Sequence, residues 1–94
     1  MNRGDVWWVN FEPIVSNESA NKFLNRVQVV PLTSNVSKLY PSEAYVIVND
    51  KQDKALADQI TTVTKARLVR MMGKLSSVDM RKIENAIRTQ LDLP

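Results

Sequence analysis

Hydrophobic and polar residues alternate in short runs over most of the chain, and this pattern predicts a protein built mainly from β-strands. Five runs rich in Val, Ile, Thr and aromatic residues are bounded by polar or proline-containing segments, which is typical of strands. The expected strands are Val6–Phe11, Arg26–Leu32, Ala44–Val48, Gln59–Val63 and Leu68–Met72.

Polar segments separate the expected strands. Pro13 is expected to end the first strand, and Pro31 should place an edge or a bulge in the second, because proline has no amide hydrogen for the ladder. Residues 33–41 are polar, rich in hydroxyls and closed by a proline, which predicts a loop. Residues 49–54 are expected to form a charged connection.

The hydrophobic period changes near the end of the chain. Ser76 is followed three residues later by Asp79, a pattern close to a capping box. Apolar residues then recur at helical spacing and predict an amphipathic helix of roughly four turns that packs on the sheet. The apolar stripe consists of Met80, Ile83, Ile87 and Leu91.

Strands first and a helix last predict a mainly β protein of the α+β class. We expect about five strands in an antiparallel sheet or a small, partly open barrel, with the C-terminal helix covering one side. We found no internal repeat and no linker in the sequence, so residues 1–94 are expected to form one domain.

One connection is too short for this fold. Between the first two expected strands, the only apolar pair is Ile14–Val15, whereas a return strand of typical length needs about 5–6 residues. We therefore expect roughly ten residues, a short loop and most of a strand, to be missing from the sequence between Pro13 and Ile14.

Composition limits the possible chemistry. The sequence contains neither histidine nor cysteine, which excludes a disulfide framework, a thiolate nucleophile and the common His and Cys metal sites. Catalysis would have to rely on carboxylates, hydroxyls, lysine or arginine. We expect no metal ion and no cofactor.

The net charge of +3 comes entirely from the second half of the chain. This excess is compatible with a polyanionic partner, although charged runs most often form a solvated face. No apolar run approaches the roughly 20 residues needed to cross a bilayer, so we expect no membrane contact and a cytoplasmic location.

Six segments follow one another in the order and spacing of a known protein family. They are Arg3–Pro13, Ile14–Asn17, Ala20–Lys22, Val29–Asn35, Ala57–Val63 and Gln90–Leu93. Together they resemble the MazF/PemK family of toxins from type II toxin–antitoxin systems. The resemblance covers nearly the whole chain and departs from the family pattern between Pro13 and Ile14, where the family has a flexible loop.

The resemblance implies both a fold and an activity. The fold would be a small antiparallel, SH3-like barrel of the CcdB–MazF type, with about five to seven strands and a C-terminal helix. The activity would be that of an mRNA interferase, a metal-independent endoribonuclease that cuts single-stranded RNA at short sequences. The RNA's own 2′-hydroxyl would attack, leaving a 2′,3′-cyclic phosphate. A homodimer and a cognate, MazE-like antitoxin would be expected as partners.

The resemblance also assigns candidate site residues. In the family, an arginine from the loop and a threonine at the end of the third strand carry the reaction. The threonine corresponds to Thr33, whose hydroxyl could donate to the phosphate. The arginine has no counterpart here. Arg3, Ser34, Asn35 and Gln59 are candidate RNA-binding residues.

Other interpretations of these residues stay open. Thr33 could simply bond to its own turn, and Ser34 and Asn35 are ordinary turn residues. Arg3 could simply be a surface residue, and Gln59 could be a solvated residue at the start of a strand. At the level of the whole chain, the alternative is a non-catalytic protein with the toxin fold. It could act like a gyrase poison, or be an inactive paralogue that only binds antitoxin.

Overall fold

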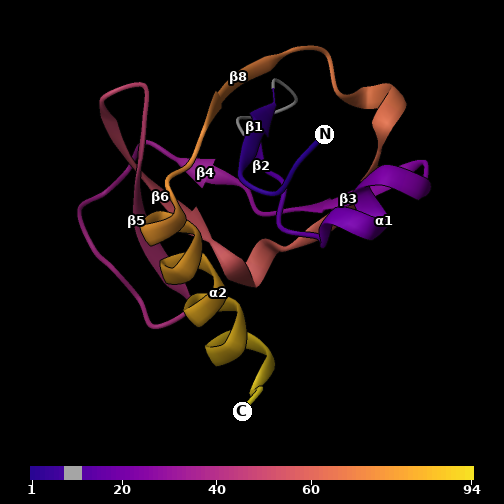
Figure 1. Ribbon diagram of the computed structural model, residues 1–94. Helices are drawn as coiled ribbons and strands as arrows, with labels where there is room; N and C mark the ends of the chain where they lie inside the picture. The colour runs from indigo at the N-terminus through magenta and orange to yellow at the C-terminus, as the bar shows by residue number, and fades with distance from the viewer. Residues whose placement is uncertain (8–11) are drawn as a thin grey trace.

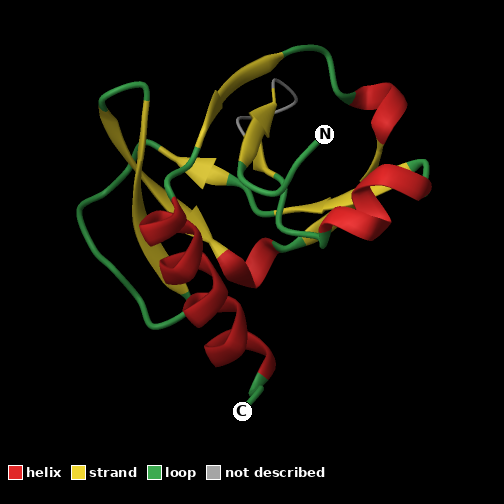
Figure 2. Cartoon of the chain, in the orientation of Figure 1, coloured by secondary structure: helices red, strands yellow, loops and turns green. Residues whose placement is uncertain are grey.

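Short antiparallel strands form most of the described regular structure before one long helix near the end of the chain (Figures 1 and 2). The computed structural model describes residues 1–7 and 12–94. The described strands are β1 Asp5–Trp7, β2 Glu12–Pro13, β3 Arg26–Val29, β4 Leu32–Thr33, β5 Glu43–Val48, β6 Lys51–Leu56, β7 Thr61–Thr64 and β8 Met71–Lys74. The helices are α1 Glu18–Phe23 and α2 Ser77–Leu91, with 3₁₀ turns η1 Ala57–Gln59 and η2 Lys65–Arg67.

The described strands form three antiparallel sheets, in the orders β2-β1-β8, β3-β7 and β4-β6-β5. The first two sheets are joined by an isolated bridge between Ile14 and Val29. The Val30 N–H also donates to the Pro13 carbonyl at 3.2 Å. This mainly β architecture with a C-terminal helix confirms the expected fold class.

The chain has reversed direction by Glu12. Val6 pairs with Pro13 and Trp7 pairs with Glu12, both antiparallel. Pro13 therefore belongs to a return strand and does not end the first one, which corrects that prediction. The remaining residues of the expected first strand, 8–11, lie outside the described part of the chain.

β2 and the two residues that follow it, Ile14 and Val15, form a short central segment between β1 and β3. The Gly4 N–H donates to the Ile14 carbonyl at 2.8 Å on one side, and the Val15 N–H donates to the Gln28 carbonyl at 2.9 Å on the other. A central strand therefore exists in the sequence as it stands. That further residues belong between Pro13 and Ile14 stays a prediction.

Residues 49–54 were expected to be a charged connection, and this prediction is wrong. Asn49 and Asp50 have φ angles of 51° and 64°, as a two-residue type I′ hairpin turn requires. β6 then pairs with β5 along its whole length, from Val48↔Lys51 to Glu43↔Leu56. The charged residues of β6 gave this strand the sequence pattern of a loop. Some of them are nevertheless buried, because they form ion pairs.

Several boundaries differ from the expected ones. Gln59 ends the 3₁₀ turn η1 instead of opening a strand, and β7 begins at Thr61. The last strand begins at Met71, later than the expected Leu68. The second expected strand divides into β3 and β4 around Pro31, which confirms the irregularity expected there.

The short helix α1 lies in a segment for which the hydrophobic pattern predicted no element. Its N-cap is Asn17, whose side-chain oxygen accepts the Ala20 N–H at 2.8 Å. Within α1, the side-chain nitrogen of the buried Asn21 donates to the Ser16 carbonyl at 2.8 Å. These polar contacts stabilise a helix with only six residues, which has too little apolar surface to be recognised by its period.

The main core lies between α2 and the sheet β4-β6-β5. The predicted cap is confirmed, because the Ser76 hydroxyl accepts the Asp79 N–H at 3.1 Å. Met80 and Ile83 are buried as expected, whereas Leu91 is 51% exposed. Figure 1 shows why: the last turn of α2 extends beyond the strands. Among the described helices, none is long and apolar enough to span a membrane.

The free edge of β5 is covered by a side chain of α2. The buried Asp79 carboxylate accepts the Ile47 N–H at 2.8 Å, and it lies 3.6 Å from the Lys82 ammonium. An unpaired strand edge can recruit other chains, and a carboxylate on its backbone donor blocks such pairing.

A buried ion pair connects β5 and β6. The Lys54 ammonium lies 3.0 Å from Glu43 Oε1 and donates to the Lys38 carbonyl at 2.8 Å. The Tyr40 N–H donates to the same Glu43 oxygen at 2.9 Å. This backbone N–H, aided by Lys54, holds the pKa of Glu43 below its ordinary value of 4.5.

This lowered pKa predicts a loss of stability in acid. The unfolded chain binds a proton at Glu43 more readily than the folded chain does. The contribution of Glu43 is therefore fully present above pH 4.5 and is lost as the pH falls through the lower folded pKa. Urea unfolding between about pH 7 and pH 3 should show a shallower acid loss for Glu43→Gln than for the wild type.

The control for this prediction is Asp58→Asn, which removes an exposed carboxylate from η1. This variant should keep the acid loss of the wild type. A Glu43→Gln protein whose stability falls with acid as steeply as the wild type would contradict the role given to Glu43.

Candidate active site

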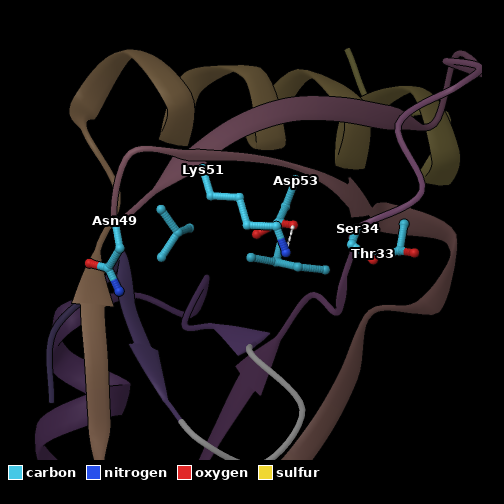
Figure 3. A pocket seen from close by; sticks show the side chains of 7 residues that line it. Thr33, Ser34, Asn49, Lys51 and Asp53 are labelled. Atoms are coloured by element: carbon cyan, nitrogen blue, oxygen red, sulfur yellow. Dashed lines mark ion pairs between the residues drawn. The ribbon is translucent and has the colours of Figure 1, made fainter.

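A cavity is formed by the ends of β4 and β5 and the start of β6, three strands of one sheet. Its volume is about 480 Å³, and it is open on one side (Figure 3). The lining comes from β4, the end of β5, the hairpin turn and the start of β6. The lining residues are Leu32, Thr33, Ser34, Val48, Asn49, Lys51 and Asp53.

Strand pairing brings the two halves of this lining together. β4 pairs with β6 through Leu32↔Ala55 and Thr33↔Lys54, while β5 and β6 form the hairpin that carries the other half. Leu32 and Val48 provide the apolar part of the wall, and the remaining side chains are polar or charged. An apolar cavity with a few converging polar groups is the usual form of a ligand site.

Thr33 lies at the cavity with part of its hydroxyl free. Thr33 Oγ1 accepts the Asn35 N–H at 3.2 Å, a bond within its own turn. A hydroxyl has one hydrogen and two acceptor positions, so this bond leaves the hydrogen available. The local turn and donation to a phosphate are therefore compatible with each other.

Ser34 lines the cavity beside Thr33, whereas Asn35 is not part of the lining. The side-chain oxygen of Asn35 accepts the Ser37 N–H at 3.3 Å and the Ser37 hydroxyl at 2.9 Å. These bonds hold the loop after β4. The Asn35 amide nitrogen donates to none of the described residues, and its role in binding RNA stays a prediction.

Arg3 lines a different cavity, together with Lys74 and Arg81. Its guanidinium donates to the Val15 carbonyl and to Glu84, both at 3.0 Å. These contacts connect the N-terminal segment to α2. The structure therefore does not bring Arg3 and Thr33 together.

Gln59 is exposed at the end of η1 and does not line the cavity with Thr33. The prediction that its amide reads a base stays untested. Trp7 is partly buried against a second apolar cluster around Val27 and Val29. Trp8 lies outside the described residues.

Three lining residues were not singled out from the sequence. Asn49, Lys51 and Asp53 all belong to the segment expected to be a charged connection. The signal that could have found them is the Asn49–Asp50 pair, a sequence that tolerates two positive φ angles and so favours a hairpin. A second strand after that turn would have placed Lys51 and Asp53 beside Thr33.

Lys51 and Asp53 form an ion pair at the cavity. The Lys51 ammonium lies 3.7 Å from Asp53 Oδ1. The two partners differ in their surroundings, because the Lys51 side chain is 67% exposed and that of Asp53 only 12%. Because the Asp53 carboxylate is nearly buried, it can influence a ligand in the cavity only through the groups that surround it.

Asn49 is fixed by the neighbouring strand β8. Its side-chain nitrogen donates to the Met72 carbonyl at 2.9 Å. A Cβ atom at Gly73 would come 3.1 Å from Asn49 Oδ1, so glycine allows β8 to pass this close. The N-terminal sheet thereby supports the hairpin that forms half of the cavity.

Glu12 is a buried carboxylate in β2. Burial raises the pKa of Glu12 above its ordinary value, and the Arg67 charge partly offsets this effect. Glu12 does not line the cavity that contains Thr33. Within residues 1–7 and 12–94, no three carboxylates gather in an arrangement that could hold a metal ion.

Comparison with known proteins finds a family that matches this chain. Residues 2–91 match the family described as PemK-like, MazF-like toxins of type II toxin–antitoxin systems. The chain is 30% identical to endoribonuclease MazF9 of Mycobacterium tuberculosis, over 99% of this chain and 98% of that protein. It is 29% identical to endoribonuclease MazF of Staphylococcus saprophyticus, over 99% and 92%.

Solved structures agree with this match. An endoribonuclease in complex with its cognate antitoxin, from a mycobacterial species, has a TM-score of 0.87 and 29% identity. That likeness covers 100% of this chain and 97% of the other. A MazE–MazF complex from Deinococcus radiodurans shares the fold, with a TM-score of 0.83 at 18% identity over 100% and 97% of the two chains.

Proposed function

Because the chain belongs to the family of PemK-like, MazF-like toxins of type II toxin–antitoxin systems, we propose that it is a sequence-specific endoribonuclease that cuts single-stranded mRNA without a metal ion. One observation carries the proposal. Two relatives named endoribonucleases match this chain over nearly its whole length, at 30% and 29% identity.

The proposed reaction is a transesterification within the RNA. The 2′-hydroxyl attacks the adjacent phosphorus and loses its proton, while the bond from phosphorus to the 5′-oxygen breaks and that oxygen gains a proton. The products are a 2′,3′-cyclic phosphate and a 5′-hydroxyl. Thr33 would donate its free hydroxyl hydrogen to a phosphate oxygen, where negative charge grows in the transition state.

We assign roles in RNA binding according to which residues line the cavity with Thr33. Ser34 lines the same cavity and would contact the nucleotide beside the scissile phosphate. Asn35, in the next position, would contact a base through its amide nitrogen. Arg3 and Gln59 would act only on nucleotides farther along the strand, because neither lines this cavity.

We propose a cognate, MazE-like antitoxin as the protein partner, a homodimer as the active form, and the cytoplasm as the location. A solved complex of a 29% identical endoribonuclease with its antitoxin supports the first of these. The alternative of a non-catalytic binding protein with this fold is not favoured, because both relatives are named endoribonucleases.

We also propose that the chain is one domain whose sequence is shorter than that of its relatives between Pro13 and Ile14. The alignment with the mycobacterial relative spans 115 positions and this chain has 94 residues, so at least 21 of those positions have no counterpart here. The shortened central strand at residues 12–15 is where such residues would fit.

Cleavage in the presence of a chelator tests the proposed activity. Incubating the protein with a long single-stranded RNA in excess EDTA should give discrete fragments that end in 2′,3′-cyclic phosphates. Adding Mg²⁺ should leave the rate unchanged. DNA of the same sequence should stay intact because it has no 2′-hydroxyl. Intact RNA at high protein concentration would refute the proposal.

A further inference from the structure

We propose that Lys51 binds the scissile phosphate of the RNA beside Thr33, and that Asp53 positions the Lys51 ammonium at the cavity. This inference rests on the proposed endoribonuclease function. It assigns a role to two residues of β6 that no sequence pattern singled out.

The reaction requires a positive charge at the phosphate. Negative charge accumulates on the non-bridging oxygens as the 2′-oxygen approaches, and a neutral hydroxyl such as that of Thr33 stabilises it only in part. Lys51 is the only cation among the described residues that line the cavity. Lys51 is therefore the described side chain at the cavity that can supply the positive charge that the reaction requires.

The ammonium of Lys51 is free to bind a ligand. It donates no hydrogen bond to any of the described residues, and its 3.7 Å separation from Asp53 is an ionic contact without a direct hydrogen bond. An ammonium has three donors, so all three are available to phosphate oxygens. The side chain is largely exposed and can reach an incoming strand.

Two other cations, Lys54 and the candidate residue Arg3, are engaged in contacts within the protein. Lys54, on the same strand, has its ammonium between Glu43 and the Lys38 carbonyl, at 3.0 Å and 2.8 Å. Arg3 has its guanidinium between Glu84 and the Val15 carbonyl. Both are part of the protein's internal structure, whereas Lys51 is not.

Asp53 explains why Lys51 stays at the cavity. A nearly buried carboxylate is costly without a counter-charge, so Asp53 favours conformations in which the ammonium lies close to it. Figure 3 shows the pair between Asn49 on one side of the cavity and Ser34 and Thr33 on the other. A phosphate would bind on the side of the ammonium away from Asp53, because the carboxylate repels it.

The test compares binding and cleavage in the same variants. Binding is measured by fluorescence anisotropy at several salt concentrations, with a single-stranded RNA oligonucleotide methylated at every 2′-oxygen so that it cannot react. Cleavage is measured as a single-turnover rate on unmodified RNA in EDTA. The variants are Lys51→Ala, Lys51→Arg and Asp53→Asn, with Lys22→Ala as the control that removes an exposed lysine from α1.

Loss of Lys51 should affect both measurements. In Lys51→Ala, cleavage should fall by about 100-fold or more. The salt dependence of binding should become shallower by about 0.7 in log–log slope, the value for one phosphate contact on a single strand. Lys51→Arg should restore most of both, and Lys22→Ala should behave like the wild type.

Loss of the Asp53 charge should separate the two measurements. Asp53→Asn removes a repulsive charge, so the RNA should bind as tightly as before or more tightly, while cleavage slows by about tenfold because the ammonium is no longer held in place. A variant that merely unfolds would lose both. Unchanged cleavage in Asp53→Asn would overturn the positioning role.

The outcomes separate this inference from the proposed function. If the wild type cuts RNA and Lys51→Ala cuts it equally fast with the same salt slope, the inference is wrong and the endoribonuclease proposal stands. If the wild type does not cut RNA but Lys51→Ala lowers the salt slope, the proposed function fails and Lys51 is still a phosphate contact.

Discussion

Replacing Thr33 with alanine is expected to lower the rate of RNA cleavage by about 10²- to 10³-fold, the loss that follows removal of one donor to a developing oxyanion. The Thr33 hydroxyl lies at the cavity. Its oxygen accepts a hydrogen bond from the Asn35 N–H, and this bond does not use the hydroxyl hydrogen. The protein should remain folded, because Thr33 is only partly buried at the end of a two-residue strand.

Two further variants make this result specific. Thr33→Ser keeps a hydroxyl on Cβ and should retain much of the activity, whereas Thr61→Ala removes an exposed hydroxyl from β7 and should have no effect. Single-turnover rates and circular dichroism spectra give the comparison. A Thr33→Ala protein that cuts RNA as fast as the wild type would show that the hydroxyl only closes its own turn.

Replacing Ile83 with alanine is expected to destabilise the fold by about 2–5 kcal/mol, the range for a large-to-small change in a core. The Ile83 side chain is completely buried in the cluster between α2 and the sheet β4-β6-β5. In a domain whose total stability is typically about 5–15 kcal/mol, the variant should unfold at a much lower urea concentration.

The matched control is Leu91→Ala on the same helix. Leu91 has the same place in the apolar period but is 51% exposed, so its loss should change stability by no more than about 0.5 kcal/mol. Urea unfolding followed by circular dichroism measures both variants. Equal losses would mean that the whole stripe contributes to the core, as the sequence alone suggests.

Local signals in the sequence were sufficient for much of the fold. The runs around β3 and β5 and the Ser76 cap of α2 depend on nearby residues, so pattern and propensity predict them. Strand β6 is different. Two of its charged residues, Asp53 and Lys54, are buried, and contacts such as that of Lys54 with Glu43 depend on tertiary structure. A polar sequence therefore concealed a central strand.

The candidate site likewise combines residues that the sequence alone could place with residues that only tertiary contacts bring there. Thr33 and Ser34 could be placed at a strand end from the sequence, and the structure puts both at the cavity. Lys51 and Asp53 reach that cavity only through the pairing of β6 with β4 and β5. Arg3 is held by Glu84, a residue 81 positions away, and no local pattern contains that information.

The contact between Asp79 and the Ile47 N–H has a consequence for synthesis on the ribosome. α2 follows every described strand in chain order, so β5 and its neighbours leave the ribosome before the carboxylate that covers their edge. Until α2 has emerged and docked, the nascent sheet presents an open edge to other chains. Completing α2 is therefore the step that protects a newly made molecule from aggregation.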